Sequence, residues 1–237
     1  MSSFTLAWHF LIFGVLPYVV IAVLILGSLA RFVLAPFSWK SQSSEILDKK
    51  DIFWGANLFH IGMIFLFCGH CFGLFTPTEW LNAAGLTPRL HQMMEIICGG
   101  LSAIVAITGL IILTWRRLTN ERVRAASRPS DFWVLLLLAG IILGIGCVVN
   151  SYLYDKSGAT IILLGGWVRG LFSFDYQAWQ NILLVPDWQK GHIFVGLIIF
   201  LIVPFTRLVH IWSGYLSVFY LIRPHQIMRA NNGKPMK

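Results

Sequence analysis

The chain has 237 residues, of which 57% are hydrophobic and only 12% are charged. Soluble domains carry about 25% charged residues, so this composition excludes an ordinary soluble enzyme and indicates a protein built for lipid. The formal net charge of +8 could suggest nucleic-acid binding, but the basic residues fall in short segments between long apolar blocks, which is typical of membrane proteins. We therefore expect a protein in contact with membrane lipid and no nucleic-acid partner.

Five apolar blocks are long enough to cross a bilayer as helices, which requires about 20 residues each. They are Trp8–Leu29, Ile52–Phe75, Ile96–Trp115, Phe132–Tyr154 and a block from His192 to about Trp212. A shorter, glycine-rich segment, Ile161–Phe174, carries Arg169, so we expect an interfacial or re-entrant piece there. The sequence predicts an all-α integral membrane protein with five transmembrane helices in a single domain over residues 1–237.

The basic residues also predict the orientation of the chain. Fourteen of the eighteen Lys and Arg residues lie in segments 31–51, 116–131 and 207–237, which share one side of a five-span topology. Cytoplasmic loops carry the excess of basic residues. We therefore expect the N-terminus outside and the C-terminus in the cytoplasm, with a cytoplasmic tail at 213–237, in the inner cell membrane.

The tetrapeptide Cys68-Gly69-His70-Cys71 raises the question of whether sulfur or imidazole carries the chemistry. A dithiol oxidoreductase would place such a motif in a soluble βαβ setting, whereas here it lies inside an apolar span. Apolar surroundings raise the pKa of a thiol and leave it inert. We interpret the cysteines as packing residues and His70 as the chemically active member of the motif.

Four of the seven histidines occupy two spans, His60 and His70 in the second and His192 and His210 in the fifth. Ionisable residues inside a membrane are costly and usually functional, although any one of them alone could be a core histidine bonded to a carbonyl. The two spans run antiparallel. The topology therefore pairs His60 with His210 and His70 with His192, with Pro204 as a source of helix bending.

Two imidazoles that face each other across a helical bundle suit the two axial positions of a haem iron. Zinc is the main competitor, but it usually takes four ligands. Arg207 lies one turn before His210 and is placed to bind a haem propionate. Arg116 could do the same at the end of the third span, or it could serve as ordinary cytoplasmic anchoring.

The blocks "NLFHIGMIFLFCGHCFGLFTP" and "VPFTRLVHIWS", with "WRRLTNERVRA" between them and "SSEILDKK" in the first inside loop, resemble the gamma subunit of respiratory nitrate reductase, a cytochrome b membrane anchor. This resemblance implies two b haems, with His70 and His192 on the outer iron and His60 and His210 on the inner one. It also implies oxidation of a membrane quinol at the outer haem. Electrons would pass to an iron–sulfur beta subunit and a molybdenum-containing alpha subunit on the cytoplasmic side, where nitrate is reduced.

The family's quinol pocket uses a basic residue near the start of the third span, commonly a lysine. Alignment on Gly99-Gly100 puts His91 at this position, with Arg89 close by, so the resemblance implies that one of the two is the quinol partner. Gly69 would then leave room for a haem face or a quinol beside His70.

Two alternatives remain open at the level of sequence. One is a related haem b anchor of another quinol-dependent reductase, of the sulfur or heterodisulfide type. The other is a transporter or channel with a histidine-lined pathway. A reduced-minus-oxidised optical spectrum would separate the second alternative from a cytochrome.

Overall fold

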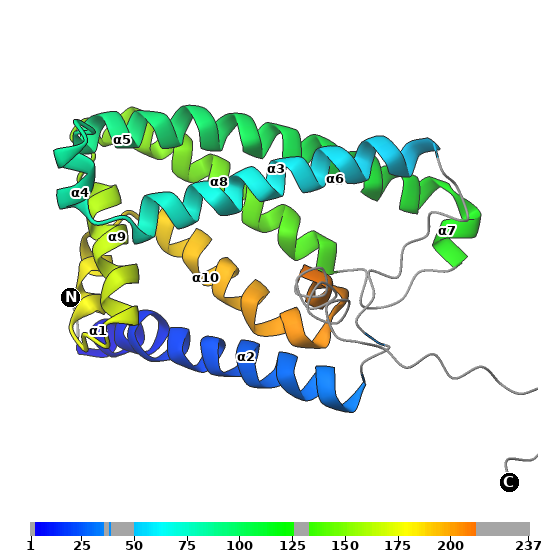
Figure 1. Cartoon of the computed structure of the whole chain (residues 1–237), viewed down its shortest axis with the longest axis horizontal. Coiled ribbons are helices and arrows are strands. Elements are labelled where there is room, and N and C mark those ends of the chain that lie inside the picture. The colour runs from blue at the N-terminus through cyan, green and yellow to red at the C-terminus, as the bar shows by residue number, and fades with distance from the viewer. Residues whose placement is uncertain (1–2, 36–37, 39–49, 126–132, 212–237) are drawn as a thin grey trace, which may run out of the picture.

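The computed structural model describes residues 3–35, 38, 50–125 and 133–211, and every element in this part of the chain is helical (Figure 1). Five helices are long and apolar enough to cross a membrane: Ser3–Leu34, Ile52–Phe75, Pro88–Thr119, Trp133–Tyr154 and Asp187–Phe205. This confirms the predicted all-α membrane fold with five transmembrane helices. The predicted cytoplasmic tail at 213–237 lies outside the described residues.

The first and third spans are each built from two α-helices joined by a π-helical turn. The first span consists of α1 (Ser3–Phe10), η1 (Leu11–Val15) and α2 (Leu16–Leu34). The third consists of α5 (Pro88–Met94), η4 (Glu95–Gly99) and α6 (Gly100–Thr119). A π-turn inserts an extra residue into the helical ladder and is frequent at functional sites.

The third span starts at Pro88, well before the predicted Ile96. Proline is favoured at the first helical position, and the preceding Thr87 accepts a hydrogen bond on its Oγ1 from Leu90 N at 3.3 Å, as an N-cap does. The prediction was wrong here because the first two turns of this helix are rich in polar side chains, which an apolar window excludes.

The remaining spans complete an elongated bundle. They are α3 (Lys50–Phe75), α8 (Trp133–Tyr154) and α10 (Asp187–Ile202). In Figure 1 the long helices run along the longest axis, with α3 beside α6 over most of their length. One core cluster joins α6 to α8 and consists of Ala103, Ala106, Leu110, Leu137 and Ile141. Many large apolar side chains point outward, as in Leu26 at 66% exposure, which suits a surface surrounded by lipid.

One end of the bundle is closed by short helices, α4 (Thr78–Ala83), α9 (Ala159–Phe172) and the 3₁₀ segment η6 (Ala178–Leu184), whereas α7 (Glu121–Ala125) lies at the opposite end (Figure 1). The segment predicted as interfacial or re-entrant is therefore a 14-residue helix, α9. It shares a second core cluster with the first span, in which Trp167 Nε1 donates a hydrogen bond to Phe13 O at 2.8 Å.

Asp155 organises the turn between α8 and α9. Its carboxylate accepts hydrogen bonds from the backbone N–H groups of Ser157, Gly158 and Thr160 at 2.9–3.0 Å. Burial opposes the charged form, but the hydrogen bonds from Thr160 and Ser157 outweigh it and hold the pKa of Asp155 below its ordinary value. Gly158 takes a positive φ of 78° at this turn, a conformation that glycine adopts without strain. The ionised Asp155 thus fixes the start of α9.

The fifth span breaks near its C-terminal end. The helix α10 stops at Ile202, and two 3₁₀ turns follow, η7 (Val203–Phe205) and η8 (Arg207–Val209). The bend expected at Pro204 is therefore a helix end, and the regular helix does not continue to His210. Arg31 of α2 donates hydrogen bonds from Nη1 to Pro204 O at 2.8 Å and Thr206 O at 2.7 Å, so it satisfies carbonyls that the break releases.

Replacing Arg31 with methionine should lower the thermal unfolding temperature of the detergent-solubilised protein. The substitution leaves the carbonyls of Pro204 and Thr206 without a donor, and burying an unpaired polar group costs roughly 1–3 kcal/mol. Arg31→Lys, which retains one charged donor group, should have an intermediate effect. Thermal unfolding followed by circular dichroism measures both, and equal unfolding temperatures for wild type and Arg31→Met would refute a clamping role.

Candidate functional site

Two pairs of histidines face each other between α3 and the fifth span. The ring centroids of His60 and His210 are 6.2 Å apart, and those of His70 and His192 are 5.9 Å apart. These are the two pairs that the antiparallel topology brings together. They follow one another along α3, so the bundle holds one pair nearer each end.

The spacing within each pair suits a metal ion bound between two imidazoles. Zinc–imidazole bonds are about 2.0–2.1 Å long, and the ring centre lies roughly 1 Å behind the ligating nitrogen. Two rings on opposite sides of one metal therefore have centroids about 6 Å apart, close to the 5.9 and 6.2 Å observed. Within the described residues, no three His, Cys, Asp or Glu side chains gather into a cluster that could hold a metal ion.

All four histidines use Nδ1 for a backbone hydrogen bond. His60 Nδ1 lies 2.7 Å from Ala56 O, and His70 Nδ1 lies 2.7 Å from Leu66 O. Two further contacts join His192 Nδ1 to Gly140 O at 3.0 Å and His210 Nδ1 to Arg207 O at 2.6 Å. A carbonyl accepts only from N–H, so these contacts place the proton on Nδ1 and the lone pair on Nε2. Metal-binding histidines usually have such a partner on their second ring nitrogen.

Small residues surround the pair formed by His70 and His192. A Cβ added at Gly69, next to His70, or at Gly196, one turn beyond His192, would have no heavy atom within 4 Å. On α8, a Cβ at Gly144 would lie 3.2 Å from His192 Cε1, so this glycine lets the ring pack against the helix. The space beside the predicted Gly69 is therefore open, as a flat cofactor or substrate would require.

Arg116 and Arg207, the two arginines predicted to bind haem propionates, lie toward the pair formed by His60 and His210. Arg116, in the last turn of α6, is only 4% exposed, which is unlike a cation that anchors in lipid headgroups. Arg207 is half-buried at the start of η8, three residues before His210. In a 3₁₀ turn, residues i and i+3 lie on the same side, so Arg207 and His210 share one face.

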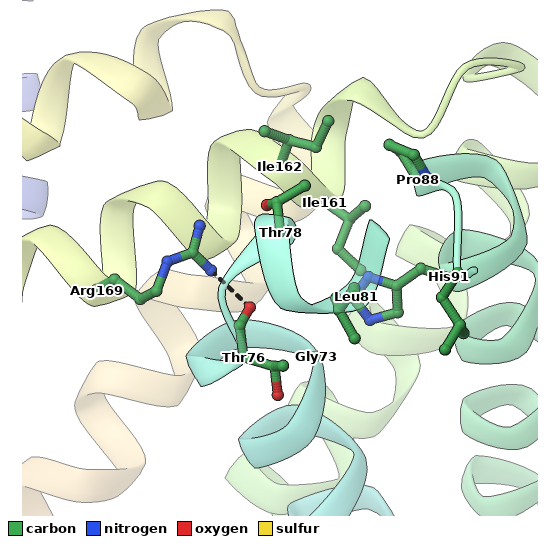
Figure 2. A pocket seen from close by; sticks show the side chains of 10 residues that line it. Gly73, Thr76, Thr78, Leu81, Pro88, His91, Ile161, Ile162 and Arg169 are labelled. Carbon is green, nitrogen blue, oxygen red and sulfur yellow. Dashed lines mark hydrogen bonds between the residues drawn. The ribbon is translucent and has the colours of Figure 1, made fainter. Parts of the chain in front are cut away.

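A small pocket lies at the end of the bundle closed by α4 and α9 (Figure 2). His91 lines this pocket together with Gly73 of α3, Leu81 of α4, and Ile161 and Arg169 of α9. The His91 ring also contacts Phe72, with centroids 6.0 Å apart, two residues beyond His70 on α3. The predicted His91 thus lies against the turn of α3 that carries His70.

The two residues predicted as quinol partners, His91 and Arg89, have different surroundings. His91 is 5% exposed, and its Nε2 has no hydrogen-bond partner. Arg89, by contrast, donates hydrogen bonds from Nη1 to Gln92 Oε1 at 2.6 Å and to Asp155 O at 3.0 Å. Arg89 therefore links α5 to the end of α8, and it does not line the pocket.

Sequence reasoning missed Glu95, which lies 3.7 Å from His91 through its Oε1 and the ring Nε2. A carboxylate four residues after a histidine lies on the same face of a helix, and this spacing inside a span was the signal that could have found it. The four cysteines form no disulfide with one another, and Cys68 is exposed rather than packed as expected.

Five membrane helices with two facing histidine pairs between them define an all-helical, multi-pass membrane protein. The sequence matches the family described as "Nitrate reductase gamma subunit" over residues 9–231. Over 219 residues it is 36% identical to the "Respiratory nitrate reductase 2 gamma chain" of Escherichia coli (strain K12). That alignment covers 92% of this chain and 95% of the relative.

Two further relatives agree with this match. The "Respiratory nitrate reductase 1 gamma chain" of the same organism is 35% identical over 221 residues, covering 93% of this chain and 96% of that one. The "Nitrate reductase gamma chain" of Bacillus subtilis (strain 168) is 36% identical over 223 residues, covering 94% and 98%. The chain belongs to the nitrate reductase gamma subunit family, whose members are membrane subunits of respiratory nitrate reductase, and the resemblance expected from the motifs is confirmed.

Proposed function

We propose that this chain is a dihaem cytochrome b subunit that oxidises a membrane quinol at its outer end and delivers the electrons inward to an iron–sulfur subunit of respiratory nitrate reductase. The proposal rests on the two pairs of facing imidazoles. The ring centroids are 6.2 Å apart in His60–His210 and 5.9 Å apart in His70–His192. In all four histidines the carbonyl contact at Nδ1 places the lone pair, the part of the ring that binds a metal, on Nε2.

The residues present fit two haem b groups. His70 and His192 would ligate the outer iron, and His60 and His210 the inner one. Arg207 and the buried Arg116 would neutralise propionates at the inner level, and the open space at Gly69 would face the outer ring. Each haem, when bound, supplies a one-electron carrier.

The orientation follows from the distribution of basic residues, which supports an outer N-terminus and a cytoplasmic C-terminus in the inner membrane. The electron-accepting partners would then be the iron–sulfur beta subunit and the molybdenum-containing alpha subunit on the cytoplasmic side. The electrons would move inward while the quinol protons are released outside, so charge would cross the membrane. Moving one elementary charge across the membrane potential corresponds to about 2.3 kcal/mol per 100 mV. Turnover would therefore build a proton-motive force.

The quinol would bind at the end of the bundle that holds His70, His192 and His91. Its oxidation releases two protons, so the site needs an acid–base group within reach. His91 is the better candidate of the two predicted residues, because its Nε2 has no hydrogen-bond partner. The guanidinium of Arg89 is engaged in holding α5 to α8 and favours a structural role.

A reduced-minus-oxidised optical spectrum of the purified chain should show two b-type haems per polypeptide. In the complex with its partner subunits, a quinol analogue should reduce them and nitrate should reoxidise them. A colourless protein would contradict the proposal and favour a histidine-lined transporter. Haems that quinol reduces but nitrate does not reoxidise would indicate an anchor of another reductase.

A further inference from the structure

Glu95 is a carboxylate inside a membrane span, to which the proposed function assigns no role. It lies seven residues beyond Pro88, the start of the third span, so it is about 10 Å along the helix at 1.5 Å per residue. An ionisable side chain at such a position is costly and by default a functional-site candidate. Glu95 also opens the π-turn η4, an irregularity that frequently marks functional positions.

Glu95 and His91 lie close together but differ in how much of each side chain is exposed. The side chain of Glu95 is 39% exposed, whereas that of His91 is 6% exposed, and the atoms Oε1 and Nε2 are 3.7 Å apart. A Cβ added at Gly73 of α3 would collide with Glu95 Oε1 and would lie 3.4 Å from His91 Nε2. The absence of a side chain at Gly73 therefore leaves room for the pair against α3.

The buried residue of the two, His91, lines the pocket at the outer end of the bundle. Besides His91, polar groups of Thr76, Thr78 and Arg169 line it, as Figure 2 shows. Its cavity volume is about 10 Å³, which is room for roughly one water molecule, and these groups offer the hydrogen-bond partners that a buried water needs. The order along this path is Glu95, then His91, then the polar pocket.

We propose that Glu95 accepts the proton released by the quinol and that His91 passes it to the polar pocket at the outer end. This inference rests on the proposed quinol oxidation. In the step, a quinol O–H bond breaks and an O–H bond forms on the Glu95 carboxylate. The proton then moves to His91 Nε2 and on to water, while the electrons leave separately to the b haems. The path carries both protons of a quinol one after the other.

The test uses the complete nitrate reductase complex carrying Glu95→Gln, an isosteric change that removes the proton acceptor. We expect kcat with a quinol analogue to fall about 100-fold, within the range that acid–base groups contribute, while KM changes less than about threefold. Glu95→Asp should restore part of kcat. Glu79→Gln makes the same charge change on an exposed residue of α4 and should leave kcat unchanged.

Assembly is checked by the haem spectrum and by nitrate reduction with a soluble dye that donates to the partner subunits directly, and both should match wild type. The double variant Glu95→Gln/His91→Gln should be no slower than the slower single variant, because the two residues act in one path. A kcat within twofold of wild type for Glu95→Gln, or multiplied losses in the double variant, would overturn the inference. A wild-type complex without b haems or quinol oxidation would instead overturn the proposed function.

Discussion

Replacing His192 with alanine should remove the outer haem, halve the haem content and abolish quinol oxidation. His192 faces His70 with ring centroids 5.9 Å apart, so the proposed outer haem would keep only His70 as a protein ligand. The inner pair, His60 and His210, does not depend on this residue and should retain its haem. Quantifying haem per polypeptide and the quinol-dependent kcat measures both parts of the expectation.

The reciprocal variant His210→Ala provides the matched control. It should remove the inner haem and keep the outer one, so that a quinol analogue still reduces the remaining haem although no electrons reach nitrate. Loss of both haems in each single variant would contradict two separate ligand pairs. Retention of both haems in His192→Ala would show that this histidine is not an axial ligand.

The five spans and the two histidine pairs could be predicted because both depend on local or topological properties. A run of about 20 apolar residues is sufficient to identify a spanning helix. Once two such helices are known to run antiparallel, the order of His60 and His70 on one and of His192 and His210 on the other dictates which residues share a level. No long-range contact has to be known for that inference.

Other features could not be predicted because they depend on packing between distant segments. The link between Arg31 and the carbonyl of Pro204 spans 173 residues of sequence, and nothing local signals it. The third span extends to Pro88, where its polar first turns contact α9, and His91 contacts Phe72 of α3, neither of which an apolar window can detect. Glu95 directly precedes the apolar block that begins at Ile96, so its spacing from His91 becomes a signal only once the span is known to start at Pro88.

Replacing Gly109 with alanine should destabilise the bundle. A Cβ at Gly109 would collide with the backbone N of Phe59 and would lie 2.7 Å from Gly55 O, so α6 touches the backbone of α3 at this point. The reverse contact occurs at Gly62, where a Cβ would lie 2.7 Å from Ala106 Cα. Small residues at such crossings allow membrane helices to approach closely, and an added methyl group must push them apart.

The displacement should reach the proposed inner haem site, because Phe59 directly precedes His60. Overpacking of this kind costs typically 1–3 kcal/mol, so Gly109→Ala should unfold at a lower temperature and bind the inner haem more weakly than the outer one. Thermal unfolding and haem quantification in detergent measure these effects.

Gly100→Ala makes the same substitution on the same helix, and we expect it to have the opposite effect on the stability of the protein. A Cβ at Gly100 would have Val148 Cγ1 at 3.8 Å as its nearest neighbour, an ordinary van der Waals contact. Alanine is favoured over glycine in a helix by about 1 kcal/mol, so this variant should be as stable as wild type or more stable. If both variants raised the unfolding temperature equally, the effect would be one of helix propensity. A loss at Gly109 alone would instead identify the crossing of α3 and α6 as the contact that positions His60 opposite His210.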